Sequence, residues 1–225
     1  MNEMLSQFRL DRLSSFEGIT LTEHTYNLAI GLTLTVGILV DLAMAWFLAD
    51  TVARMNTLVI LAVYLIGSFG CTFVIYRSKN PVISFAGFLG LSAAMGLLLT
   101  NLITAYSLGS IRAAFTITGV VFVVMVALST AFPQTFLSIG RGLGIALLTT
   151  LVVEVIAGLL FRTYLTMSDY AVALIFCGYV GYDWARAQQY PKTLDNAIDC
   201  AADIFVDIIN LFIRILRIVE RSRRD

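Results

Sequence analysis

Long apolar stretches alternate with short polar connections along the chain from about residue 26 onward. A run of about 20 apolar residues is long enough to cross the hydrocarbon core of a bilayer as a helix. Seven such runs can be read: Tyr26–Leu48, Thr57–Tyr76, Pro81–Thr100, Ala113–Phe132, Ile139–Phe161, Tyr170–Ala187 and Ala197–Val219. The pattern predicts an all-α membrane protein with seven transmembrane helices.

The same pattern predicts three regions: a cytoplasmic N-terminal segment at residues 1–25, a seven-helix membrane domain at 26–219 and a basic C-terminal tail at 220–225. Composition agrees, because 59% of the 225 residues are hydrophobic and only 13% are charged, against about 25% charged in soluble domains. The net charge is zero, so we expect no nucleic-acid partner. His24 is the single histidine, which argues against a His-based catalytic or metal site. We therefore expect neither an enzyme nor a resident cofactor.

Arginines and lysines predict the orientation, since they are enriched in cytoplasmic loops. With the N-terminus inside, the inner side carries Arg9, Arg12, Arg77, Lys79, Arg141, Arg186 and Lys192, and the outer side carries Arg54, Arg112 and Arg162. A seventh crossing would put five further arginines outside: Arg214, Arg217, Arg221, Arg223 and Arg224. Either the seventh segment is re-entrant or the rule fails for this chain.

Four aspartates follow one another at a spacing of four residues in "DNAIDCAADIFVDIINLF", residues 195–212. In a helix this spacing places Asp195, Asp199, Asp203 and Asp207 on one face. We expect the first two to be solvated near the helix start, where acidic side chains favour the positive end of the helix dipole. A polar face on an apolar helix points into a bundle or a wet cavity. Asp203 and Asn210 are therefore interpreted as the lining of an inward-facing vestibule.

Ionisable residues within membrane helices are candidates for function. These candidates are Asp41, Glu154, Asp183 and Asp207. Asp41 is expected to form hydrogen bonds in the interior or at the interface. Glu154 either pairs with a neighbouring helix or lines a pathway. Asp183 and Asp207 lie on consecutive predicted helices. Two facing carboxyls in a low-dielectric interior titrate as a coupled pair, which makes a pH sensor, and their oxygens suit Ca²⁺. The alternative is that they serve packing, with Arg77 or Arg214 as counter-ion.

The stretch "GYDWARAQQYP…DCAADIFVDIINLFIRILRI" resembles the C-terminal signature of the Bax inhibitor-1 (transmembrane Bax inhibitor motif) family. That signature places an aspartate after an aromatic residue in the sixth span, here Tyr182-Asp183, and a second aspartate in the seventh, here within "VDIINLF" at 206–212. Weaker similarity extends over residues 24–219, as in "HTYNLAIGLTLTVG" and "SFAGFLGLSAAMGL". The resemblance is to a divergent bacterial-type member.

The resemblance implies six helices around a central seventh and a pH-sensitive calcium leak governed by Asp183 and Asp207. Arg77 would be a competing counter-ion of this pair. The implied partners are the lipid bilayer, calcium ions, protons and a further membrane protein, and the implied location of a bacterial member is the plasma (inner) membrane. An alternative is a non-conducting regulator of cell death or of a membrane protease.

An intramembrane aspartyl protease is a third hypothesis, since those enzymes also use a Tyr-Asp motif, as at Tyr182-Asp183. Their second aspartate normally follows a Gly-x-Gly sequence that lets the substrate backbone approach. Asp207 follows Ile204-Phe205-Val206 instead, which makes this hypothesis the weakest of the three.

Overall fold

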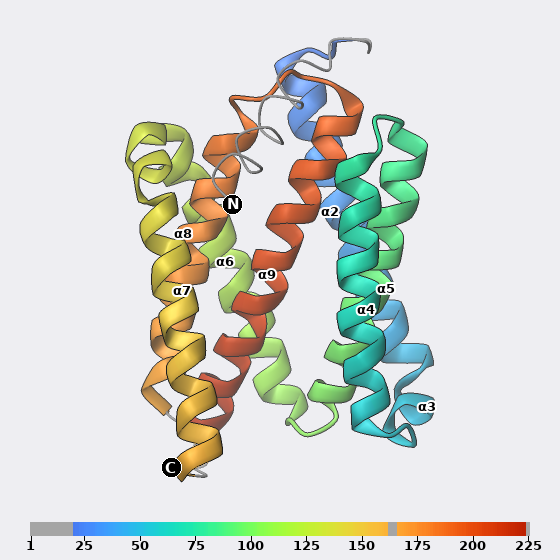
Figure 1. Cartoon of the computed structure of the whole chain (residues 1–225), viewed down its shortest axis with the longest axis vertical. Coiled ribbons are helices and arrows are strands. Elements are labelled where there is room, and N and C mark those ends of the chain that lie inside the picture. The colour runs from blue at the N-terminus through green and yellow to red at the C-terminus, as the bar shows by residue number, and fades with distance from the viewer. Residues whose placement is uncertain (1–19, 162–165, 224–225) are drawn as a thin grey trace. The chain divides into compact units, whose positions relative to one another are not determined.

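The computed structural model describes residues 20–161 and 166–223, and every regular element in this part of the chain is a helix (Figure 1). The elements are α2 (Glu23–Phe47), α3 (Ala49–Ala53), α4 (Thr57–Arg77), α5 (Pro81–Ile103), α6 (Leu108–Ala131), α7 (Pro133–Phe161), α8 (Thr166–Ala187) and α9 (Leu194–Ser222). The predicted all-α class is confirmed for this part of the chain.

Five of these helices are long and apolar enough to cross a membrane: α2, α4, α5, α6 and α7. Their surfaces carry large exposed apolar side chains, such as Trp46 on α2, Ile66 on α4 and Val123 on α6. Such side chains would be unfavourable in water and are suited to contact with lipid. The helices α8 and α9, which correspond to the sixth and seventh predicted spans, have 22 and 29 residues but are more polar.

Short polar side chains begin four of the apolar helices, each by accepting a hydrogen bond from a backbone N–H of the first turn. Thr22, Asn56, Asn80 and Ser107 are these N-caps of α2, α4, α5 and α6. Pro81 occupies the first turn of α5, where its missing N–H costs no helical hydrogen bond. These residues fix where each apolar segment starts.

The structure corrects several predicted boundaries. A short helix, α3, follows the first predicted span, and α6 begins at Leu108 rather than Ala113. The helix α7 begins at Pro133, directly after the α6 C-cap residue Phe132, so the stretch "AFPQTFLS" is mostly helical and the predicted start at Ile139 is too late. The predicted N-terminal segment up to residue 19, with Arg9 and Arg12, and the tail residue Arg224 lie outside the described residues, as does Arg162.

The chain forms two compact units, and α9 contributes residues to both. Unit 1 comprises the described part of residues 1–104 together with 187–205. Within it α5 packs against both α2 and α4 (Figure 1). Tyr26 of α2 is fully buried, and its hydroxyl donates to the carbonyl oxygen of Ala187 at 3.2 Å. This bond ties the start of α2 to the last residue of α8, from which the chain leads into α9.

Unit 2 comprises residues 105–186 and the described part of 206–225, with α6, α7, α8 and the second half of α9. The helices α7 and α8 approach closely where glycines replace side chains. Gly140 of α7 lies against the ring of Tyr182, and Gly181 of α8 lies against the ring of Phe136. From α6, Thr130 accepts a hydrogen bond from the indole N–H of Trp184 at 2.9 Å. These contacts fix the rotation of α8, and therefore the direction in which Asp183 points.

Candidate functional site

Asp183 lies in the last turns of α8, with only 8% of its surface exposed. Its Oδ1 atom forms an ion pair with Nη2 of Arg186, three residues later, at 2.9 Å. The guanidinium of Arg186 also lies over the ring of Tyr182, 5.3 Å from the ring centre. The "YDWAR" sequence thus builds a local charged pair whose cation is held in place by a neighbouring aromatic ring.

Asp207 lies on α9 in the same unit, with 6% of its surface exposed. The hydroxyl of Tyr179 is within electrostatic reach of Asp207, Asp183 and Arg186. Tyr179 is one helical turn before Asp183, so both side chains lie on the same face of α8. Unit 2 therefore gathers two buried carboxyls, one arginine and one phenol.

The predicted counter-ion of this pair, Arg77, is the last residue of α4 in unit 1, and its side chain is exposed. Its role stays a prediction. Arg186 is a cation that pairs with Asp183 in the structure, whereas the sequence predicted only its place on the inner side of the membrane. Its spacing from Asp183 was the available signal, because residues three apart are neighbours on a helix.

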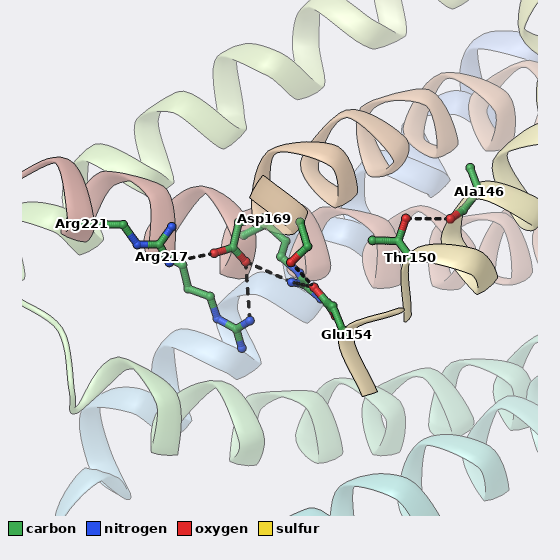
Figure 2. A network of polar contacts seen from close by, with 8 residues as sticks. Ala146, Thr150, Glu154, Asp169, Arg217 and Arg221 are labelled. Atoms are coloured by element: carbon green, nitrogen blue, oxygen red, sulfur yellow. Dashed lines mark hydrogen bonds and ion pairs between the residues drawn. The ribbon is translucent and has the colours of Figure 1, made fainter. Parts of the chain in front are cut away.

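A second charged cluster lies in the same unit, where α7 ends and α8 begins (Figure 2). Arg214 of α9 donates from Nη1 to Oε1 of Glu154 at 2.7 Å and from Nη2 to Oε2 at 3.1 Å. The hydroxyl of Ser168 donates to Oε1 of Glu154 at 2.6 Å. Of the two interpretations of Glu154, pairing with a neighbouring helix is confirmed. A pathway role stays a prediction.

Asp169 is the centre of this cluster and is fully buried. Its oxygens lie 3.0 Å from Nη1 of Arg214, 3.7 Å from Nη1 of Arg217 and 3.2 Å from Nη2 of Arg221. Those three arginines recur at spacings of three and four residues and so share one face of α9. This role of Asp169 was not predicted, although the arginine spacing is a visible signal in the sequence. Arg214, one of the two counter-ions named for the aspartate pair in the packing alternative, pairs with Glu154 and Asp169.

The first half of the acidic face of α9 lies in unit 1, where Asp199 is not solvated as predicted and Asp195 is solvated only in part. Asp195 is half-buried and accepts a hydrogen bond from Ser84 of α5 at 2.6 Å. Asp199 is only 3% exposed. Asp203 accepts a hydrogen bond from the hydroxyl of Tyr76 of α4. These carboxylates can be buried because α4 and α5 present hydroxyl groups to this face of α9. The hydroxyls supply hydrogen bonds that bulk water would otherwise provide.

Asn210, the remaining predicted vestibule residue, is half-buried on α9, and its Nδ2 donates to the carbonyl oxygen of Val206 at 2.8 Å. Its amide thus bonds to the preceding turn of its own helix. As to metal binding, no cluster of three or more His, Cys, Asp or Glu side chains is found within residues 20–161 and 166–223. Ca²⁺ takes six to eight oxygen ligands, more than the two carboxyls of Asp183 and Asp207 supply.

Comparison with known proteins gives a consistent result. A family model described as "Inhibitor of apoptosis-promoting Bax1" matches residues 21–224. The inner membrane protein YbhL of Escherichia coli strain K12 is 26% identical over 217 residues, which cover 89% of this chain and 93% of that protein. The Golgi anti-apoptotic protein of vaccinia virus strain Lister is 25% identical over 171 residues (74% and 70%). Mouse protein lifeguard 4 is 25% identical over 168 residues (72% and 68%).

Proposed function

The chain belongs to the family of inhibitors of apoptosis-promoting Bax1, and on that premise we propose that it is a pH-sensitive calcium leak channel whose sensor is the pair Asp183 and Asp207. Membership makes it a multi-pass integral membrane protein of a non-enzymatic family. The intramembrane protease hypothesis is therefore set aside. The resemblance noted from the sequence is confirmed.

The architecture that goes with this proposal has seven crossings, with α8 and α9 added to the five apolar helices and α9 at the centre. The 29 residues of α9 give a length of about 43 Å at about 1.5 Å per residue, enough for a hydrocarbon core of about 30 Å. Its polar face argues for an interior position, because polar groups facing lipid would be left without hydrogen bonds.

The observation that supports the proposal is that Asp183 and Asp207 are both buried and belong to the same compact unit. In such a site two uncompensated negative charges are costly, so binding of a proton or a cation by the pair is favoured. Protonation of Asp183 would release Arg186 from its ion pair. That change in charge biases the packing of α8 against its neighbours and shifts the equilibrium between closed and open states.

Other charged residues have supporting roles in this proposal. Asp203 and Asn210 extend the polar face of α9 on either side of Asp207, and Glu154 anchors the far part of α9 through Arg214. Arg77 would compete for the pair in one of the two states. Calcium ions and protons are the permeating and regulating species, and the lipid bilayer is the environment.

The experiment is Ca²⁺ entry into dye-loaded liposomes that contain the purified protein, measured from acidic to neutral pH. Wild type is compared with Asp183→Asn and Asp207→Asn, and Asp50→Asn at an exposed position of α3 serves as the matched control. We expect a pH-dependent flux that loses its pH response in both sensor variants and keeps it in the control. A flux whose pH response survives both sensor substitutions would contradict the assignment.

The alternative function is a non-conducting regulator that acts on another membrane protein. The names of one relative and of the family favour it, since the vaccinia protein is described as anti-apoptotic and the family as inhibitors of apoptosis-promoting Bax1. This alternative function requires that the purified protein transport no Ca²⁺ into liposomes at any pH. A protective effect on dying cells that persists in Asp183→Asn and Asp207→Asn would then favour the regulator.

A further inference from the structure

The contact between α2 and α5 in unit 1 buries a carboxyl group. Asp41 lies well inside α2, and only 3% of its surface is exposed. It faces Gly96 of α5 so closely that a Cβ atom at Gly96 would lie 2.7 Å from its Oδ1 atom and 2.9 Å from the sulfur of Met44. Any side chain at position 96 would displace the carboxyl, so the α5 backbone forms one wall of its site.

Neither carboxyl oxygen of Asp41 has a hydrogen-bond partner among the described residues. The nearby hydroxyls of α5 do not supply one, because Thr100 donates to the carbonyl oxygen of Gly96 at 2.7 Å and Ser92 donates to that of Phe88 at 3.0 Å. This differs from the hydrogen-bonding role that the sequence analysis expected for Asp41. The difference arises because α5 uses its own hydroxyls within the helix.

Among the described residues of unit 1, no charged group pairs with Asp41 either; Arg54 and Lys79, which follow α3 and α4, are exposed. Pro81–Ile103 of α5 contains no ionisable side chain, and Asp50 of α3 is exposed. The carboxyls that α9 contributes to the unit are Asp195, Asp199 and Asp203, of which the first and last bond to Ser84 and Tyr76. On α4 the cation is Arg77, at the exposed end of the helix. In the connection before α9, Lys192 donates to Gln188.

An ionised carboxyl without partners in such surroundings is far more costly than a neutral one with an unused hydroxyl. We propose that Asp41 is a second proton-binding site of this protein, separate from the Asp183 and Asp207 pair, which holds its proton while α2 contacts α5 at Gly96. Loss of the proton requires that water reach the carboxyl, and this requires the two helices to separate there. Proton binding at Asp41 is thereby linked to the packing of α2 on α5.

Infrared spectroscopy tests this directly, because a protonated carboxyl has a C=O stretching band that a carboxylate lacks. The background is the double variant Asp183→Asn/Asp207→Asn, which removes the other candidate pair, and Asp41→Asn is added to it. At neutral pH we expect a protonated-carboxyl band in the double variant that is missing from the triple variant. Identical spectra in this region would overturn the proposal. The outcome does not depend on ion flux, so it is separable from the proposed channel function.

A second variant keeps the test decisive if Asp41→Asn disturbs folding. Gly96→Ala in the same double background adds the methyl group that would push the carboxyl away from α5. We expect the band to disappear at a lower pH than in the double variant, because a displaced carboxyl is better hydrated and releases its proton more readily. Gly31→Ala on α2, where a Cβ meets no atom within 4 Å, is the matched control. A band unaffected by Gly96→Ala would contradict the link to helix packing.

Discussion

Arg214 clamps both carboxylate oxygens of Glu154 from a position 60 residues later in the chain, at 2.7 and 3.1 Å. This two-point geometry is the strong form of an arginine–carboxylate pair. Arg214 also reaches Asp169, so a single guanidinium joins the end of α7, the start of α8 and the second half of α9. The cluster is therefore a polar connection that joins all three of these helices of unit 2 (Figure 2).

Replacing Arg214 by Gln should destabilise the protein more than any other single change at an arginine of this cluster. The substitution leaves Glu154 and Asp169 with less compensation in a site where the Arg214 side chain is only 13% exposed. Breaking a buried pair in this way costs about 3–5 kcal/mol, and partial exposure of Glu154 places the loss at the lower end of that range. Thermal unfolding in detergent measures it.

Arg221→Gln is the matched control for that experiment. Arg221 contacts the same carboxyl of Asp169, but its side chain is 32% exposed. Asp169 keeps Arg214 and Arg217 as partners in this variant, so the unfolding temperature should fall less than for Arg214→Gln. Equal losses in the two variants would mean that the cluster acts through total charge rather than through the clamp on Glu154.

The same cluster bears on the orientation problem that the sequence raised. The helix α9 is continuous over Leu194–Ser222, and it shows no break of the kind that a re-entrant segment needs to turn back. Its arginines at 214, 217 and 221 meet Glu154 and Asp169 rather than standing alone. A rule that counts basic residues overestimates the free positive charge at this end, because two of the three charges are neutralised within the protein.

Glycines on α7 offer a test of the close contact with α8. A Cβ at Gly140 would overlap the ring of Tyr182, whereas a Cβ at Gly142, two residues later, meets no described atom within 4 Å. Gly140→Ala should therefore destabilise by about 1–3 kcal/mol through overpacking. Gly142→Ala should be neutral or stabilising by up to about 1 kcal/mol, since alanine favours the helix.

Thermal unfolding of these two single variants measures the change in stability. We expect the two changes to differ in sign as well as in size. Because Tyr182 precedes Asp183 and lies under Arg186, Gly140→Ala should also alter the pH response in the liposome assay. A stabilised Gly140→Ala protein with an unchanged pH response would show that α7 and α8 do not approach as closely as described.

Much of this architecture follows from the sequence, because hydrophobic runs and their caps are local signals. Asn80 and Pro81 are residue types that begin helices, so the start of α5 can be predicted from the sequence. The four-residue spacing of the α9 aspartates likewise predicts that they share one face of the helix. The partners of those aspartates do not follow, since Ser84 and Tyr76 belong to helices whose rotation is set by packing. Asp169 was missed for the same reason. Its three arginines lie some 45–52 residues away, and its meaning depends on α9 lying beside the start of α8.

The connection between α8 and α9 supplies a prediction of pH dependence outside the membrane-spanning segments. Partial burial lowers the pKa of Lys192 below its ordinary value, against an opposing effect of Glu23. The ammonium donates to the carbonyl oxygen and to Oε1 of Gln188, at 2.9 and 3.2 Å, and lies 4.5 Å from the centre of the Tyr26 ring. The folded protein therefore holds Lys192 in a site that favours the neutral amine more than water does.

The sign follows from proton binding in the two states. Between the lowered pKa of the folded protein and the ordinary lysine pKa, the unfolded chain binds more protons than the folded one, so stability from this group rises with pH across that window. Lys192→Arg keeps the positive charge but does not titrate there. The unfolding temperature of wild type should therefore increase relative to that of Lys192→Arg as the pH is raised through the alkaline range. Parallel curves for the two proteins would show that Lys192 is as well hydrated in the folded state as in the unfolded chain.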